Sequence, residues 1–332
     1  MATHRAHAPA LRPPAEPTVS LDACLPAELR GPRTTITKIA AGLSGAGVHR
    51  VEVDDRVYVL KVAPEGQALG DWRRTLFILR AASDAGLAPR LVHGDESRRA
   101  MVSEFVTDQS FPRLYGDPST HDAALVLLGT TLRRVHALPV PPDAAPIQPL
   151  HRLRTRRDRW AGLPLPRVAT DVVERALTEP PPPAERAVVL SHNDPNPTNL
   201  VLDGDRLVLL DWDAAAPNDP LYDLAVVSLF LLMDDMTSRR LIAAHDDAAL
   251  VSLSPVFLYY RWLTGVKLGE AFLSMACQAG CDGAAGPATL DTVPPLGEFY
   301  AKMRAGALSV TTREGQWAFG LGLLKEAHAL ER

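Results

Sequence analysis

The sequence predicts an α+β fold with two lobes, a small antiparallel sheet followed by a larger and mostly helical part. Between 35 and 62, apolar and polar residues alternate as they do in half-buried strands. From 123 onward several stretches have helical periodicity, and a strand–loop–strand segment at 188–210 interrupts them. The 332 residues are enough for a substantial core. We divide the chain into a flexible tail (1–17), an N-lobe (18–106) and a C-lobe (107–332).

Composition and charge restrict the partners and the location of the protein. The net charge of −4 argues against a nucleic-acid partner. The tail lacks the apolar segment of a secretory signal, and the longest apolar run, Leu224 to Met233, is too short to cross a bilayer. Cys24, Cys277 and Cys281 form no disulfide or zinc framework. We therefore expect a cytoplasmic monomer or homodimer with no nucleic-acid or membrane partner.

The predicted N-lobe begins with three antiparallel strands, Thr35–Ile39, Val48–Val53 and Val57–Val62. The first two are joined by Gly42-Leu43-Ser44-Gly45-Ala46-Gly47, in which glycines would let backbone N–H groups approach phosphate oxygens. A plain turn is the alternative, because glycine is common in all turns. Lys61 follows in the third strand, where it either binds phosphate or extends from an edge strand into water.

The remaining elements follow from periodicity and from end signals. A helix is predicted at Gln67–Ala82, ended by Gly86-Leu87-Ala88-Pro89. Two more strands and five helices follow, at Arg90–Val92, Met101–Val106, Ala123–Leu138, Leu221–Met233, Ala249–Tyr260, Val266–Ala276 and Glu314–Glu331. Asp219-Pro220 is a helix start, with an acidic N-cap and proline at the first helical position.

Several polar and aromatic groups have two interpretations each. His136, near a helix end, is predicted to be a packed or capping histidine more than an acid or base. The arginines of His151–Trp160 suggest a solvated helix face more than an anion site. Tyr259, Tyr260 and Trp262 suggest core more than a cation box. The acidic pairs at 234–235 and 246–247 either attract a cationic substrate or are simply exposed.

The segment from Val188 to Ala225 carries the densest set of chemical groups. A strand, Val188–Leu190, leads into a loop, and two short strands then flank the hairpin turn Asp203-Gly204-Asp205. A tight hairpin would bring Asp194, Asn199 and Asp211 together at its open end. Oxygen-bearing side chains of this kind suit Mg²⁺, which leaves its other positions to water and phosphates. The spacing His-x-Asp-x4-Asn, followed by an aspartate that ends the next strand, matches the kinase catalytic-loop and metal-loop pattern.

The motifs SHNDPNPTNL, LVLLDWD and NDPLYDLA resemble the aminoglycoside phosphotransferase and choline kinase family of small-molecule kinases, over about residues 35–275. The resemblance implies a two-lobed protein-kinase-like fold and the cofactors ATP and Mg²⁺. It makes Asp194 the catalytic base and Asn199 and Asp211 the metal ligands. The residues it implies for ATP binding are Gly42, Ser44, Gly45, Gly47, Lys61, Glu104 and Val106, the last two marking the backbone that binds adenine. The supporting residues around the site are His192, Asp213, which lies near the metals or is merely solvated, and Asp223, which steadies the catalytic loop.

Two departures from protein kinases refine this hypothesis. Asn193 and Asp213 replace the arginine and glycine usual there, which points to the small-molecule relatives. The helix after Lys61 lacks the glutamate that should pair with the lysine, and Asp71 is the substitute we expect. The predicted activity is ATP-dependent phosphorylation of a hydroxyl on an aminoglycoside-, choline- or other amino-alcohol-like molecule. The alternatives are a catalytically weak, nucleotide-binding pseudokinase and a metal hydrolase built from His192, Asp194 and Asp211.

Overall fold

A computed structural model of the chain describes residues 20–39, 47–107, 109–148, 150–151, 153–155 and 162–330. Three groups of sequence predictions therefore lie outside the described residues. These are the tail 1–17, most of the glycine-rich loop with Gly42, Ser44 and Gly45, and most of the arginine-rich segment. The chain forms two compact units, the first made of residues up to Trp72 and of Leu91–Phe105, the second of Arg73–Arg90 and Val106–Arg332.

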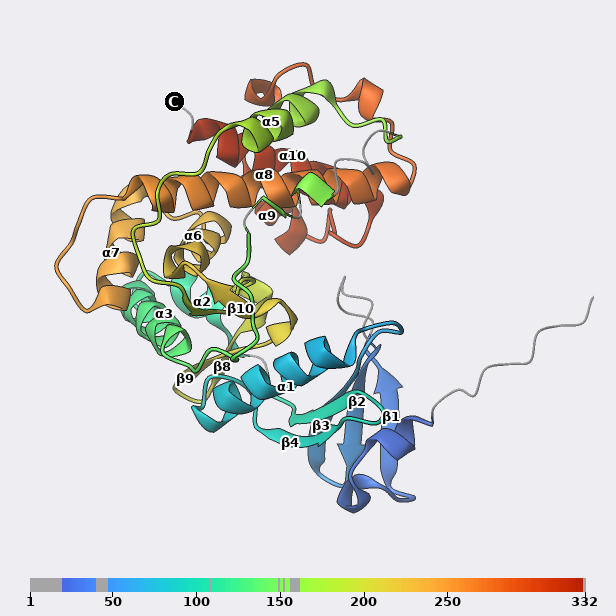
Figure 1. The fold of residues 1–332 in the computed structure, drawn as a ribbon. Coiled ribbons are helices and arrows are strands. Elements are labelled where there is room, and N and C mark those ends of the chain that lie inside the picture. The colour runs from blue at the N-terminus through green and yellow to red at the C-terminus, as the bar shows by residue number, and fades with distance from the viewer. Residues whose placement is uncertain are drawn as a thin grey trace, which may run out of the picture. The chain divides into compact units, whose positions relative to one another are not determined.

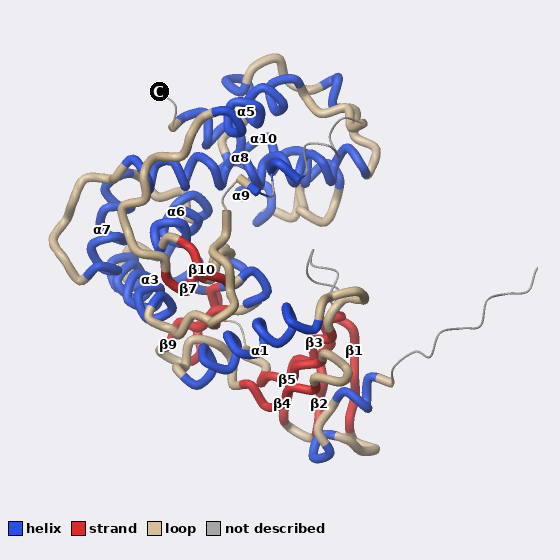
Figure 2. The backbone as a smooth tube through the Cα atoms, in the orientation of Figure 1, coloured by secondary structure: helices blue, strands red, loops and turns tan. Residues whose placement is uncertain are grey.

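The first unit is a five-stranded antiparallel sheet with the order β1-β2-β3-β5-β4. Its strands are β1 (Thr34–Lys38), β2 (Gly47–Val53), β3 (Arg56–Val62), β4 (Leu91–Asp95) and β5 (Ala100–Glu104). The sequence analysis predicted all five, with ends that differ by at most three residues. Alternating side chains of β2, β3 and β5 form a core with two short 3-10 turns, Leu21–Cys24 and Ala27–Leu29. Figure 2 shows the strands of this sheet in red.

The second unit is mostly helical, as predicted (Figure 1). The helix α1 (Leu69–Asp84) begins in the first unit and continues into the second. The other helices are α2 (Phe111–Gly116), α3 (His121–His136), α5 (Arg167–Thr178), α6 (Pro220–Phe230), α7 (Asp235–Asp246), α8 (Pro255–Gln278), α9 (Leu296–Arg304) and α10 (Arg313–Ala329). Strands β6 (Gln109–Ser110), β8 (Leu200–Asp203) and β9 (Arg206–Leu209) form one small sheet, and β7 (Val189–Ser191) pairs with β10 (Ala216–Asn218).

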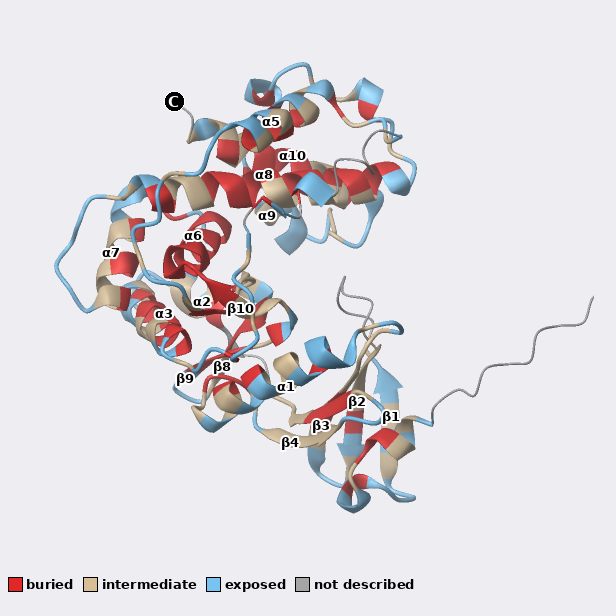
Figure 3. Ribbon diagram, viewed as in Figure 1, coloured by how far each residue is buried: buried red, intermediate tan, exposed pale blue. Residues whose placement is uncertain are grey.

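The helix α6 is the centre of the second unit. Every one of its residues, Pro220 to Phe230, is buried, so the helix is covered by protein on all sides (Figure 3). Asp219 caps it as predicted, since its carboxylate accepts the Leu221 N–H at 2.9 Å. In the part of the chain that the structure describes, no helix is both long and apolar enough to span a bilayer.

The helices predicted at Ala249–Tyr260 and Val266–Ala276 have wrong boundaries, whereas the one predicted at Glu314–Glu331 is α10 to within two residues. Residues 249–254 are not helical, and the two helices predicted at Ala249–Tyr260 and Val266–Ala276 are one helix, α8. Its start is set by Ser254, whose hydroxyl accepts the Phe257 N–H at 3.2 Å, with proline at the first helical position. The helix α7, capped by Asp234, was not predicted because few apolar residues mark its buried side.

The long helix α8 packs along α10, and small residues make the approach possible (Figure 1). A Cβ atom on Gly269 would lie 2.7 Å from the Leu324 side chain, and one on Gly320 would lie 2.9 Å from the Gly269 carbonyl oxygen. Trp262 is buried in this core, with Tyr259 packed against it. These two aromatic side chains are therefore core residues, as the sequence analysis favoured.

Candidate active site

The loop between β7 and β8 is built on an unusual backbone conformation at Asn193. Its φ is +66°, in the left-handed region that asparagine tolerates better than most residues. The Asn193 side-chain nitrogen, Nδ2, donates to the carbonyl oxygens of Ser191, Ala214 and Ala216 at 3.2, 3.0 and 3.0 Å. Its Oδ1 accepts from Asn218 at 2.7 Å. The residue therefore fixes the turn through both its backbone and its side chain, a role that no sequence signal had indicated.

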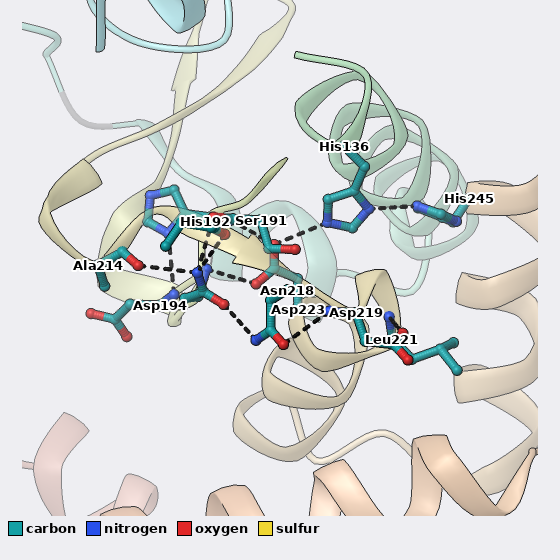
Figure 4. A network of polar contacts seen from close by, with 12 residues as sticks. His136, Ser191, His192, Asp194, Ala214, Asn218, Asp219, Leu221, Asp223 and His245 are labelled. Carbon is teal, nitrogen blue, oxygen red and sulfur yellow. Dashed lines mark hydrogen bonds and ion pairs between the residues drawn. The ribbon is translucent and has the colours of Figure 1, made fainter. Parts of the chain in front are cut away.

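Asp223 lies beneath this loop and is fully buried. Its two carboxylate oxygens accept the N–H groups of His192 and Asn193, each at 2.8 Å (Figure 4). One of these oxygens also lies 3.0 Å from His136 Nε2. Burial alone would raise the pKa of Asp223, but the hydrogen bond and charge of His136 and the hydrogen bond from the His192 N–H lower it. An ionised carboxylate thus holds two successive residues of the loop.

His192 is fully buried, and both of its ring nitrogens are engaged. Nε2 donates to the Leu210 carbonyl oxygen at 2.9 Å, and Nδ1 accepts the Asp194 N–H at 3.3 Å. Burial lowers the pKa of His192, so the ring is neutral, as this pair of bonds requires. The edge of the ring also packs against Trp212, with centroids 4.8 Å apart. The histidine joins the loop to the end of β9.

Asp194 and Asn199 are brought together by the 3-10 turn Pro197–Asn199. The Asn199 side-chain amide donates to the Asp194 carbonyl oxygen at 2.9 Å and lies 3.3 Å from its Oδ2. The other carboxylate oxygen of Asp194 accepts from Asn196 at 3.0 Å. The Asp194 carboxylate is therefore oriented by two neutral amides, and it is half-buried.

The hairpin β8–β9 delivers Asp211 to the same region. Gly204, with φ +66°, makes the predicted turn, and Leu200 is paired with Leu209. The Leu210 N–H donates to the Asn199 carbonyl oxygen at 2.9 Å, so the backbone at Asp211 lies next to Asn199. Asp211 has φ +58° and an exposed side chain, and Asp213, in the 3-10 turn that follows, is exposed as well.

The donor set fits a magnesium ion and does not fit a zinc hydrolase. Because the Asn199 side-chain nitrogen donates to Asp194, Asn199 Oδ1 and the Asp211 carboxylate are the oxygen atoms that could hold a metal ion here. His192 uses both nitrogens in hydrogen bonds and offers no lone pair to a metal. Among the described residues, no three His, Cys, Asp or Glu side chains are grouped so that they could hold a metal ion. This arrangement weighs against the metal hydrolase built from His192, Asp194 and Asp211.

The predicted ATP-binding residues that the structure describes belong largely to the sheet of the first unit. Gly47 begins β2 opposite Val62, so the end of the glycine-rich loop lies one pair away from Lys61, which faces Val48. Glu104 ends β5 opposite Tyr58. The chain passes from the first unit to the second between Phe105 and Val106, which is where the adenine-binding backbone was predicted.

Sequence analysis missed the side chains that support the loop from behind. His136 is buried and bonded to Asp223, and Asn218 is buried and bonded to Asn193. The only signal for His136 was its position at the end of a helix rich in apolar residues, and a packed histidine gives the same signal. Asn218 directly precedes the helix cap Asp219, and the sequence analysis assigned a role to the cap only.

The sequence and the fold both match known phosphotransferases. Residues 35–263 match the model of the phosphotransferase enzyme family. Protein LicA of Haemophilus influenzae is 47% identical over 36 residues, a stretch that covers 11% of this chain and 14% of that protein. A choline/ethanolamine kinase family protein from Mesorhizobium loti superimposes with a TM-score of 0.60 and 17% identity, covering 93% of this chain and 97% of that one.

A second solved structure extends the fold comparison. Spectinomycin phosphotransferase APH(9)-Ia, in complex with ADP and spectinomycin, has a TM-score of 0.57 and 13% identity, and the match covers 90% of this chain and 93% of that one. At these identities the likeness shows a shared fold. The predicted kinase-like α+β fold is therefore confirmed.

Proposed function

The chain belongs to the phosphotransferase enzyme family, and from that premise we propose that it transfers the γ-phosphoryl group of ATP to a hydroxyl of a small molecule. The observation that carries the proposal is the loop of Asp194. Its carboxylate is oriented by Asn196 and Asn199, and the loop itself is held by the buried carboxylate of Asp223. Phosphoryl transfer depends mainly on positioning and charge stabilisation, and this loop is fixed by hydrogen bonds on both sides.

Asp194 is the proposed catalytic base. In this role its carboxylate accepts the proton of the substrate hydroxyl as the oxygen attacks the γ-phosphorus. Asn196 and Asn199 are neutral donors, and their hydrogen bonds orient the carboxylate. The half-buried position leaves part of the side chain open to a substrate.

The remaining roles concern ATP. We assign Asn199 Oδ1 and the Asp211 carboxylate to Mg²⁺, which neutralises the phosphate charge when it is bound. Lys61 and the glycine-rich loop that ends at Gly47 are assigned to the phosphates, and the backbone from Glu104 to Val106 to adenine. Lys61 presents a compact point charge suited to phosphate oxygens.

The class of substrate is a small alcohol, with an amino-alcohol as the preferred form. The similar solved structures are named for choline or ethanolamine in one case and hold spectinomycin in the other. Choline, ethanolamine and spectinomycin are the compounds of those two proteins, and for this chain they are the first compounds to test.

The test is an ADP-production screen with purified protein, Mg²⁺ and ATP across aminoglycosides, choline, ethanolamine and other alcohols. The blank is Asp194→Asn, which keeps the shape and removes the base, and it should lower turnover at least ~100-fold for any true substrate. ATP affinity, measured by calorimetry, should stay unchanged in the variant. Equal turnover by wild type and Asp194→Asn on a verified substrate would exclude Asp194 as the base. ATP binding without turnover of any alcohol would favour the pseudokinase.

A further inference from the structure

A chain of buried side chains extends from Asp223 away from the loop (Figure 4). His136 Nε2 lies 3.0 Å from Asp223 Oδ2, and His136 Nδ1 lies 2.8 Å from His245 Nε2. His245 Nδ1 is 2.7 Å from Asp246 Oδ1. Arg186 then binds both oxygens of Asp246, each at 2.7 Å. The chain starts at the backbone of the Asp194 loop and ends at the partly exposed pair of Asp246 and Arg186.

Four separate parts of the second unit supply these side chains. His136 ends α3, Asp223 lies in α6, and His245 and Asp246 end α7. Arg186 comes from the segment before β7. Both histidines are more than nine-tenths buried. The acidic pair at 246–247 is thus not simply exposed, because Asp246 belongs to this chain and only Asp247 lies on the surface.

The number of hydrogen bonds fixes the number of protons. Three bonds link Asp223, His136, His245 and Asp246, and each needs one proton between its two heavy atoms. An ionised carboxylate supplies no proton, and two neutral imidazole rings supply two. All three bonds are therefore made only when the two histidines share three protons and together carry one positive charge.

The surrounding charges match that protonation state. Burial alone would raise the pKa of Asp246, but hydrogen bonds from Arg186 and His245 lower it, so this carboxylate is ionised. Burial lowers the pKa of His245, the hydrogen bond to Asp246 raises it, and the charge of His136 lowers it. A fourth proton would set two N–H groups against each other between the rings, which lie 2.8 Å apart at His136 Nδ1 and His245 Nε2, so the pair holds no more than three. Asp223, the histidine pair, Asp246 and Arg186 then carry charges of −1, +1, −1 and +1, so the charges within this chain of side chains balance.

Other charged groups lie around this chain. They are Arg133 on α3, Asp219 at the start of α6, Asp247 after α7, Glu185 beside Arg186, and His192 in the loop. Arg133 and Asp247 pair with each other at 3.1 Å on the surface. That pair also joins α3 to α7, but it makes no bond to the histidines.

We propose that His245 and Asp246, anchored by Arg186, are positioning residues for the Asp194 loop, and that the His136–His245 pair holds three protons in the active protein. The pair keeps His136 Nε2 protonated toward Asp223, which in turn holds the His192 and Asn193 N–H groups. Loss of the third proton at high pH removes one of the three bonds. This role rests on the proposed function, because the loop it positions carries the proposed base.

Two variants of His245 separate positioning from simple packing. His245→Leu leaves His136 Nδ1 buried without a partner, and kcat should fall ~5- to ~100-fold, the range for a displaced reacting group. The ATP KM should change less, since the contacts assigned to the first unit are unaltered. His245→Gln offers an amide N–H to His136 Nδ1 without a third proton, and it should restore kcat to within about twofold of wild type. The proposal predicts that wild-type kcat declines at high pH, when the third proton is lost, and His245→Gln should remove this decline.

The matched control is Asp247→Asn, next to Asp246, which breaks the surface pair with Arg133 and keeps a residue that tolerates the left-handed backbone at this position. Its kcat should equal that of wild type. Equal losses of kcat in His245→Leu and His245→Gln would overturn the positioning role, and so would a loss in Asp247→Asn as large as that in His245→Leu.

A measurement without turnover keeps this inference separate from the proposed function. Nitrogen–proton NMR of histidine-labelled protein reports how many ring nitrogens of His136 and His245 carry protons. Three protonated nitrogens at neutral pH support the proposal, and two overturn it. Hydrogen exchange at the His192 and Asn193 amides should also be faster in His245→Leu than in wild type, and unchanged exchange would contradict the link to the loop. Both measurements can be interpreted whether or not the protein phosphorylates any alcohol.

Discussion

Replacement of Asp223 by asparagine removes the charge that holds the Asp194 loop while it keeps the shape of the side chain. The carboxylate accepts three hydrogen bonds, from the N–H groups of His192 and Asn193 and from His136 Nε2. The best placement of the new amide puts its oxygen toward His192 and His136, which turns its NH₂ group toward the Asn193 N–H. One charge-assisted bond, worth ~1.5–3 kcal/mol, is lost, and a buried donor is left unsatisfied at a cost of ~1–3 kcal/mol. We expect the free energy of unfolding of the second unit to fall by roughly 2.5–6 kcal/mol.

Urea unfolding, followed together with hydrogen exchange at the His192 and Asn193 amides, measures this loss. The control is Asp122→Asn, which breaks an exposed ion pair with Arg240 between α3 and α7 and should cost no more than ~1 kcal/mol. If Asp223→Asn unfolds like the control, and if the Asn193 amide exchanges no faster than in wild type, the carboxylate does not hold the loop.

The pH dependence of this loss has a definite sign. The pKa of Asp223 is lower in the folded protein than in the unfolded chain, so its stabilisation is fully present above the unfolded pKa of ~3.9 and disappears as the pH falls through the folded pKa. The difference in stability between wild type and Asp223→Asn should therefore be constant near neutral pH and should shrink only in strong acid. A difference that shrank near pH ~6.5, the usual histidine range, would assign the effect to a histidine.

Three further outcomes are expected. Asn199→Ala and Asp211→Ala should weaken the Mg²⁺-dependent part of ATP binding, and Asp211→Ala should do so more strongly because it removes a charge. Calorimetry of ATP binding with and without Mg²⁺ checks this. If the metal dependence is unchanged in both variants, these residues are not the metal ligands. Lys61→Ala should weaken ATP binding ~10- to ~100-fold, which corresponds to the loss of one charge-assisted hydrogen bond, and should leave adenosine binding unaffected. An equal loss of affinity for adenosine would show that the lysine does not bind the phosphates. His192 is buried and neutral with a lowered pKa, so its contribution favours the folded state above the unfolded pKa of ~6.5 and is lost as the pH falls below it. The decline in stability between about pH 6.5 and 5 should be smaller in His192→Asn than in wild type, and an equal decline would show that another group is responsible.

Local sequence patterns were enough to predict the sheet of the first unit and the order of the elements that carry the site. The strands around Lys61, the turn at Gly204 and the helix start at Asp219 depend on alternation, glycine and capping, which act over a few neighbouring residues. The contact between Asp194 and Asn199 is also local, because the two residues lie five positions apart and the 3-10 turn Pro197–Asn199 brings them together. These features could be predicted because their physical causes lie within short stretches of sequence.

The side chains that support the Asp194 loop could be identified only from the tertiary structure. Asp223 is bonded to His136, 87 positions earlier in the chain, and His136 to His245, 109 positions later. A histidine at a helix end gives the same local pattern whether it packs, caps or shares a proton, and its partners are chosen by how α3, α6 and α7 pack together. The helix α8 was misjudged for a related reason, since burial against α10 makes one continuous helix of residues whose local pattern suggested two. Periodicity reports which side of an element is apolar, whereas the protonation and partners of a buried polar group depend on distant parts of the chain that meet only in the folded state.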